Sequence, residues 1–220
     1  MLAEKSQYLT AGIHIGMKTC TPYMKKFIYK VREDGLAVFN LKMVDERLKT
    51  AAEFLSVFDT VIAVSRKESG QRAVQAFARA LGTHGVAGRF TPGTLTNPHF
   101  RGFQEPEAVI VVDPLIDSQV VNEAKRKRIP IVALCDTFNM AKDIDLVIPA
   151  NNNGRKSLAL IFWILSREIL KNKGTLKKDS DFKFTLDEFG DVPKEEVMEE
   201  PEQPVGLKRQ PPKEKTRRRE

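Results

Sequence analysis

The sequence is poor in the residue types that build disulfide frameworks and metal sites. Its 220 residues include two cysteines, Cys20 and Cys135, which lie far apart and outside any paired motif. Such cysteines do not form a disulfide framework, and they favour a reducing compartment. The three histidines, His14, His84 and His99, are dispersed and show no metal-ligand spacing. The sequence therefore predicts no bound metal.

Long apolar runs are also missing. No apolar stretch follows Met1, so we expect no signal peptide. The longest apolar run, residues 158–165, is far shorter than the roughly 20 residues that cross a bilayer. We therefore expect a cytoplasmic protein without a membrane partner.

The motifs of nucleotide-binding enzymes are incomplete. The segment 65–70 lacks the G-x-G-x-x-G spacing that holds a pyrophosphate. The segment 151–157 resembles a phosphate loop, but Arg155 stands where lysine is needed, and no glycine lies five residues before Gly154. A helix N-terminus rich in Asn, Gly and Arg can still accept a phosphate, including one that belongs to RNA.

Residues suited to catalysis are scattered along the chain. No G-x-S-x-G elbow occurs, so serine hydrolase chemistry has no support. Three aspartates follow predicted strands, where they could serve metal or acid chemistry. Asp117 precedes a helix and suits an N-cap, while Asp113 and Asp136 suit turns, so we favour structural roles. We expect no enzymatic reaction, no cofactor and no small-molecule substrate.

What the chain has in excess is positive charge. Its formal net charge is +7, and its sequence pI is about 9.4. Residues 175–220 hold 11 Lys and Arg against 12 Asp and Glu, so residues 1–174 hold 25 against 17, a net charge of +8. The basic character therefore belongs to the folded body. A positive body favours polyanions, nucleic acid first and an anionic membrane second.

Short strands and helices alternate through the first 174 residues. Apolar runs rich in Val and Ile, without alternation, are typical of strands buried on both faces of a parallel sheet. Such runs cover residues 60–65, 86–90, 108–113, 130–136 and 146–149. Helical periodicity covers residues 42–57, 70–81, 117–128 and 155–171. The alternation predicts right-handed βαβ units in a three-layer α/β/α sandwich.

This body has an extension at each end. Before it, residues 27–31 and 36–41 flank Asp34 and Gly35, which is a hairpin signal. After Gly174 we expect residues 175–190 to be partly ordered, because they still contain a small apolar cluster. Residues 191–220 are rich in Pro, Glu, Lys and Arg. They cannot bury enough apolar area to offset the entropy of ordering, so we predict that they are disordered.

The basic residues of the body gather at a few places. Six of them lie near the N-terminus or around the start of the predicted helix 70–81: Lys18, Lys25, Lys26, Arg66, Lys67 and Arg72. A solvated helix face carries such charges too, so both interpretations stay open. The loop 89–98 is more informative, because it offers hydroxyls, amides and backbone N–H groups. Those groups suit contacts with phosphates and riboses.

Three separated segments resemble the ribosomal protein S2 family of the small subunit. They are residues 8–16 (YLTAGIHIG), residues 88–97 (GRFTPGTLTN) and the stretch from Pro106 to Pro130. The resemblance covers about residues 6–174, with the motifs in the family's order. Bacterial members insert a long helical hairpin before the first core strand, but here Phe58 leads almost directly into Thr60. The chain is therefore most similar to the archaeal branch; the eukaryotic relative is the laminin-receptor-like ribosomal protein.

The resemblance implies a flavodoxin-like sheet of five parallel strands in the order 2-1-3-4-5. It implies a structural constituent of the small ribosomal subunit, placed between head and body, that is not a homo-oligomer. The implied partners are small-subunit ribosomal RNA and neighbouring ribosomal proteins. The residues expected to contact RNA are Gly12, His14, Gly16, Lys18, Lys25, Lys26, Arg66, Lys67, Arg72, Arg89, Thr91, Gly93, Thr94, Thr96, Asn97, Asn151, Asn152, Arg155 and Lys156.

Two other functions stay open. A doubly wound enzyme that binds a phosphorylated small molecule would suit the fold class and the polar residues Asp113, Asp136 and Asn151 after the strands. An adhesion or interaction module, by analogy with the eukaryotic relative, ranks last because the chain shows no secretion feature.

Overall fold

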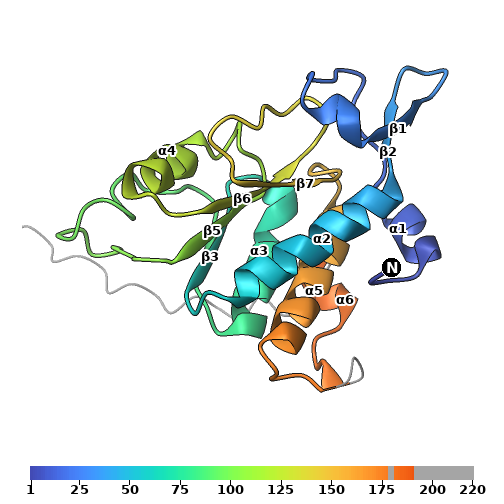
Figure 1. Ribbon diagram of the computed structural model, residues 1–220. Helices are drawn as coiled ribbons and strands as arrows, with labels where there is room; N and C mark the ends of the chain where they lie inside the picture. Colours follow the sequence, from blue (N-terminus) through green and yellow to red (C-terminus); the bar gives the residue numbers. More distant parts are fainter. Residues whose placement is uncertain (178–180, 191–220) are drawn as a thin grey trace, which may run out of the picture.

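The computed structural model describes residues 1–177 and 181–190, and its centre is a parallel sheet (Figure 1). The strands lie in the order β4-β3-β5-β6-β7. Counted along the chain from the first core strand, this is the expected order 2-1-3-4-5. The strands are β3 (Val61–Ser65), β4 (Gly85–Ala87), β5 (Ala108–Val111), β6 (Ile131–Cys135) and β7 (Leu146–Pro149).

The strand predictions are confirmed with one shift. β3, β5 and β6 are buried along their whole length, as expected for strands covered on both faces. The weakest of the apolar runs predicts a strand at residues 86–90, but β4 ends at Ala87. Gly88 has a φ of +101°, which takes the backbone out of the extended region and turns it into the loop that follows.

Four long helices cover the sheet. They are α2 (Leu41–Ser56), α3 (Glu68–Leu81), α4 (Ser118–Lys127) and α5 (Arg155–Asn172), each close to its predicted range. α2 and α3 both pack on α5 and form one layer, whereas α4 contacts β5 and β6 on the other side of the sheet (Figure 1). The connections β4–β5 and β6–β7 contain no helix. The second layer is therefore completed by loops, and these loops lie where a ligand could reach them.

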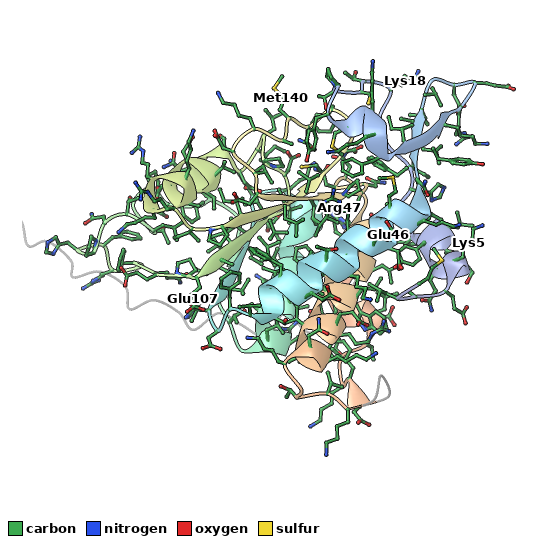
Figure 2. The ribbon with its side chains drawn as sticks, in the orientation of Figure 1. Lys5, Lys18, Glu46, Arg47, Glu107 and Met140 are labelled. Carbon is green, nitrogen blue, oxygen red and sulfur yellow. The ribbon has the colours of Figure 1, made fainter. Side chains whose placement is uncertain are left out.

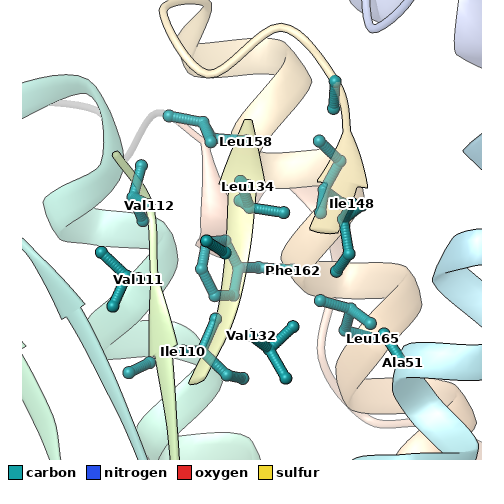
Figure 3. Close-up of a cluster of buried hydrophobic side chains, with 14 of the residues drawn as sticks. Ala51, Ile110, Val111, Val112, Val132, Leu134, Ile148, Leu158, Phe162 and Leu165 are labelled. Carbon is teal, nitrogen blue, oxygen red and sulfur yellow. The ribbon is translucent and has the colours of Figure 1, made fainter. Parts of the chain in front are cut away.

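The core lies between the sheet and the layer that contains α5. Phe162 of α5 faces Val132 and Leu134 of β6, with Ile110 of β5 beside them (Figure 3). All four side chains have no exposed surface. Burying one such side chain contributes about 1.5–3 kcal/mol. The packing of α5 on the sheet therefore supplies a large part of the stability of the fold.

The N-terminal residues form a separate small layer. α1 (Lys5–Ala11) and the short 3-10 helix η1 (Met24–Phe27) were not predicted. The predicted hairpin is confirmed: β1 (Ile28–Val31) pairs antiparallel with β2 (Ala37–Phe39), and Gly35 takes a φ of +83° in the turn. Ile15 bridges to Val38, which ties the segment after α1 to the hairpin.

The C-terminal extension packs on α5. The Trp163 indole N–H donates a hydrogen bond to the Phe184 carbonyl at 3.0 Å, and the Phe182 ring lies 5.9 Å from the Trp163 ring. α6 (Leu186–Phe189) follows and buries Phe189. The described part of residues 175–190 thus packs on α5 through an apolar cluster. The prediction of disorder for residues 191–220 falls outside the described residues.

Candidate nucleic-acid interface

A buried polar network fills the carboxyl edge of the sheet, the edge where parallel α/β folds usually hold ligands. Its centre is Lys67, whose ammonium lies 2.9 Å from Asp113 Oδ2. The same ammonium donates to the side chains of Asn152 (3.3 Å) and Asn153 (2.6 Å). These residues follow β3, β5 and β7. The topology therefore brings together side chains that are more than 80 residues apart in the sequence.

The network continues across β6. Asn139 donates to Asp113 Oδ1 at 2.9 Å and accepts from the Asn152 amide at 3.0 Å. The Asn153 amide donates to Asp136 Oδ2 at 3.0 Å. Asp113, Asn139 and Asn152 are at most 1% exposed. Side chains of the protein thus satisfy one another at the position that a small ligand occupies in related architectures.

The aspartates have structural roles, but not all of them are the predicted ones. Asp113 Oδ1 accepts from the Leu115 N–H at 3.0 Å, and the Asp136 carbonyl accepts from the Asn139 N–H at 3.1 Å, so both residues begin turns as predicted. Asp117 occupies the N-cap position of α4 but makes no side-chain cap. Its Oδ1 accepts instead from the backbone N–H of Arg66, 2.9 Å away. The N-cap position is therefore confirmed, but the side chain does not cap α4, because a backbone donor from the β3–α3 loop holds Oδ1.

Asp117 is a buried carboxylate with an incomplete set of partners. It is 2% exposed, and its Oδ2 has no hydrogen-bond partner among the described residues. Burial raises its pKa to about 6, against the opposing effect of the hydrogen bonds from the backbone of Arg66 and Asp113. Asp117 therefore titrates closer to neutrality than an ordinary aspartate, and one of its oxygens has no partner among the described residues.

The N-terminal segment crosses the carboxyl edge beside this network. Asn151 makes two hydrogen bonds to this segment: its N–H donates to the Ile13 carbonyl (3.0 Å) and its side-chain amide donates to the Gly12 carbonyl (3.1 Å). Farther along, Thr21 donates to the Thr137 carbonyl at 2.8 Å. Two predicted contact regions, residues 12–18 and 151–156, thus form one surface.

Gly16 is required at the closest point of this crossing. A Cβ at this position would lie 2.5 Å from Thr137 Cγ2 and 3.2 Å from the Ala37 carbonyl oxygen. Gly16 is buried, so it serves close packing of the segment. His14 nearby is half-buried, and burial lowers its pKa. His14 therefore brings little positive charge to the surface at neutral pH.

The loop 89–98 is shaped by a residue that the sequence reasoning did not single out. Glu123 of α4 accepts from the backbone N–H groups of Gly93 (2.8 Å) and Leu95 (3.1 Å) and from the Thr96 hydroxyl (3.3 Å). Burial alone would raise the pKa of Glu123, but hydrogen bonds from Gly93, Gln119, Leu95 and Thr96 outweigh it and lower the pKa. Two of the expected backbone donors are thus already used inside the protein.

The sequence does contain a signal for Glu123. It lies three residues after Val120 and one before Ala124, both buried in α4. An acidic residue on the apolar face of a helix requires buried donors. The donors here come from a loop that is distant in the sequence, so only the fold could identify them.

The predicted contacts differ in their access to solvent. Lys67, Asn152, Gly16 and Thr94 are used in internal packing or hydrogen bonds. Gly12, His14, Gly93, Thr96 and Asn151 are half-buried. The exposed ones are Lys18, Lys25, Lys26, Arg66, Arg72, Arg89, Thr91, Asn97, Arg155 and Lys156.

The exposed basic residues form two groups rather than one. Arg66 and Arg89 line the same small pocket beside Asp117. Lys25 and Lys26 lie on η1, where the Lys26 ammonium is 3.7 Å from the centre of the Tyr23 ring. Figure 2 shows Lys18 and Met140 along the upper side of the molecule, whereas Glu107, before β5, lies well below them on the left. The N-terminal group thus faces away from the amino edge of the sheet.

Residues 1–177 and 181–190 contain neither a metal-ligand cluster nor a helix that could cross a membrane. No three His, Cys, Asp or Glu side chains come together there as a metal-ligand set would. No helix in these residues combines the length and the apolarity that a bilayer crossing requires.

Comparisons with known proteins agree with this architecture. The family described as "Ribosomal protein S2" matches residues 8–101 and 100–172. A curated protein of the archaeon Staphylothermus marinus, "Small ribosomal subunit protein uS2", is 46% identical over 191 residues. The alignment covers 86% of this chain and 87% of that protein. The matched residues include both the N-terminal segment and the loop held by Glu123.

Proposed function

Since the chain belongs to the ribosomal protein S2 family, in its archaeal branch, we propose that it is a structural constituent of the small ribosomal subunit. In this role it binds small-subunit ribosomal RNA and neighbouring ribosomal proteins between head and body, on ribosomes of the cytoplasm. The observation that carries the proposal is the family match together with a folded body of net charge +8. It performs no reaction in this role.

Among the residues predicted to contact RNA, we propose that the solvent-exposed ones make the contacts. Arg66, Arg72 and Arg89 supply charge around the β3–α3 loop, and Lys18, Lys25 and Lys26 supply it at the N-terminal layer. Phosphate contacts of this kind position a protein on folded RNA, and they account for much of the affinity. Lys67 and Asn152 act indirectly, since their side chains hold the loops from which the exposed residues project.

No contact among the described residues favours the alternative function, an enzyme that binds a phosphorylated small molecule. Its support was the polar edge formed by Asp113, Asp136 and Asn151. Each of these three side chains already has partners within the protein. Their arrangement is explained by the need to satisfy buried polar groups.

The test is a binding titration of the full chain on a small-subunit ribosomal RNA fragment over a range of salt concentrations. We expect affinity to fall steeply, with a log–log slope of about −0.7 to −0.9 per neutralised phosphate. Replacing Arg66, Arg72 and Arg89 with Ala should weaken binding and flatten the slope by roughly two to three.

A matched control loses the same charge elsewhere. Lys49, Arg126 and Lys127 are exposed on α2 and α4, and their replacement with Ala should leave most of the affinity. Thermal melting checks that both variants are folded. Salt-independent binding, or equal losses in the two triple variants, would contradict the proposed function or its location.

A further inference from the structure

A small pocket opens beside the loop 89–98, next to the carboxyl ends of β3 and β5. Its volume is about 190 Å³, and Arg66, Arg89 and Asp117 line it together with Phe90 and Pro92. Sites for whole cofactors or drug-sized ligands measure about 300–1,000 Å³. The pocket therefore suits a unit smaller than a cofactor, such as the sugar-phosphate part of one nucleotide in a longer chain.

Asp117, which lines the pocket, keeps one buried carboxylate oxygen without a partner. Asp117 Oδ1 is taken by the Arg66 N–H, but Oδ2 has no partner in the described part of the chain, although the side chain is 98% buried. A buried polar atom without a partner costs free energy, so native structures rarely keep one without a reason. An ionised carboxylate accepts hydrogen bonds, so a hydroxyl or N–H donor would satisfy this oxygen.

The pocket also presents two cations to the same ligand. The side chains of Arg66 and Arg89 are exposed, and neither guanidinium makes a hydrogen bond or a close ion pair with another described residue. Guanidinium groups bind phosphate oxygens in a fork geometry. A ligand that fits all three residues carries a phosphate and, close to it, a hydroxyl or N–H donor.

The wall of the pocket is held in place before any ligand binds. Phe90 is 7% exposed, and the segment after Pro92 is anchored by the two N–H groups that donate to Glu123. Arg66 is anchored through its own backbone by Asp117. A preformed site loses little conformational entropy when a ligand binds. A site that offers only a few contacts therefore keeps more of their binding energy.

We propose that this pocket is a nucleotide subsite of the RNA interface, in which Arg66 and Arg89 hold a phosphate and Asp117 Oδ2 accepts the 2′-hydroxyl of the adjoining ribose. The inference rests on the proposed function and adds to it a means of distinguishing RNA from DNA. The 2′-hydroxyl is the group by which proteins make that distinction at a given position.

The test compares three short single strands of one mixed sequence: RNA, DNA and 2′-O-methyl RNA. The 2′-O-methyl strand keeps the oxygen but lacks the hydroxyl hydrogen that would donate a hydrogen bond to Asp117. The full chain should bind RNA about tenfold more tightly than either analogue, which corresponds to one charge-assisted hydrogen bond. Asp117→Asn keeps an acceptor for the Arg66 N–H but places an NH₂ group at Oδ2, so it should remove the preference.

The matched control is Asp59→Asn. Asp59 is exposed at the amino end of β3, and its replacement removes the same charge at the opposite edge of the sheet. This variant should keep the tenfold preference. Should Asp117→Asn fail to fold, the wild-type protein supplies the readout: the Arg66 amide resonance should shift with RNA and shift much less with the 2′-O-methyl strand.

The outcomes distinguish failure of the nucleotide subsite from failure of the proposed function. Equal binding of the three strands by wild type, or an unchanged preference in Asp117→Asn, overturns the subsite while salt-dependent binding of ribosomal RNA still supports the proposed function. Failure of the wild-type chain to bind either ribosomal RNA or the short strands overturns both.

Discussion

The carboxylate of Glu123 lies 2.8 Å from the backbone nitrogen of Gly93, which belongs to a loop thirty residues earlier in the chain. The second carboxylate oxygen accepts from the Leu95 N–H. One buried side chain of α4 therefore determines the shape of the loop that carries Thr91 and Asn97 on its surface. A glutamate in this role supports the interface without being able to contact a phosphate itself.

Replacing Glu123 with Gln should destabilise the protein, since an amide has only one oxygen to accept hydrogen bonds from Gly93, Leu95 and Thr96. Hydrogen bonds to a charged group contribute about 1.5–3 kcal/mol, and we expect a loss in that range from urea unfolding at neutral pH. The control is Asn122→Ala on the exposed side of the same helix, which should change stability little. A loss no larger than that of the control would remove Glu123 from this role.

The contribution of Glu123 should depend on pH with a definite sign. Its pKa is lower in the folded protein than the value of 4.5 expected when unfolded. The stabilisation is thus fully present above about pH 4.5 and is lost as the pH falls through the folded pKa. The stability difference between wild type and Glu123→Gln, measured by urea unfolding at each pH, should be constant near neutrality and shrink below pH 4.5. A difference that grows in acid would contradict the assignment.

Gly16→Ala should be strongly destabilising, because the new methyl group meets Thr137 Cγ2 at 2.5 Å in a fully buried position. Overpacking of this kind costs about 1–3 kcal/mol, which thermal melting detects. Thr137→Ser removes that methyl group and keeps the hydroxyl that accepts from the Met17 N–H. The double variant should therefore be more stable than Gly16→Ala alone. Simple additivity of the two losses would show that the contact is not the cause.

Lys67→Met should lower the stability of the protein, chiefly at the carboxyl edge of the sheet. In the protein that remains folded, RNA affinity should change little. It leaves Asp113, which is fully buried, without its counter-ion, and breaking such a pair costs about 3–5 kcal/mol. Adding Asp113→Leu should recover part of the loss in a double-mutant cycle. The contrary result is a Lys67→Met variant of unchanged stability with weakened RNA binding, which would place Lys67 among the direct contacts.

The two cysteines should react at very different rates with a thiol reagent. Burial raises the pKa of both thiols, and for Cys135 the shift is larger because no part of the residue is exposed. Cys20 is half-buried. In the native protein we expect one slow reaction, at Cys20, and no reaction at Cys135 until urea unfolds the chain. Mass spectrometry of Cys20→Ser, which should remain unlabelled when native, checks the assignment.

The sheet and its four long helices could be predicted from sequence because each depends on local periodicity. Runs such as residues 131–135 are apolar without alternation, and residues 155–171 repeat at helical spacing. The order of the strands followed from the family resemblance. α1 and η1 were missed because they are short and gain their stability from burying Tyr8 and Met24 against distant residues.

The candidate interface was predictable only in part. Exposed charges such as Arg66 and Arg89 could be selected by composition, but their shared pocket depends on tertiary structure. Lys67 differs from Arg66 by one position in the sequence, yet its side chain is held by Asp113 while that of Arg66 is exposed. Nothing in local sequence distinguishes two neighbouring cations, since the residue that binds the Lys67 ammonium lies 46 positions away.

The crossing of the N-terminal segment over the sheet has a consequence for the order of folding during synthesis. Residues 12–21 are made early, but their hydrogen-bond partners Thr137, Asn139 and Asn151 come 118 to 139 positions later. Chains fold from the N-terminus as they emerge, and contacts of high sequence separation form slowly. The segment can pair with the nearby hairpin early, through Ile15 and Val38. Its docking on the edge of the sheet waits until most of the chain is made, and this step completes the candidate interface.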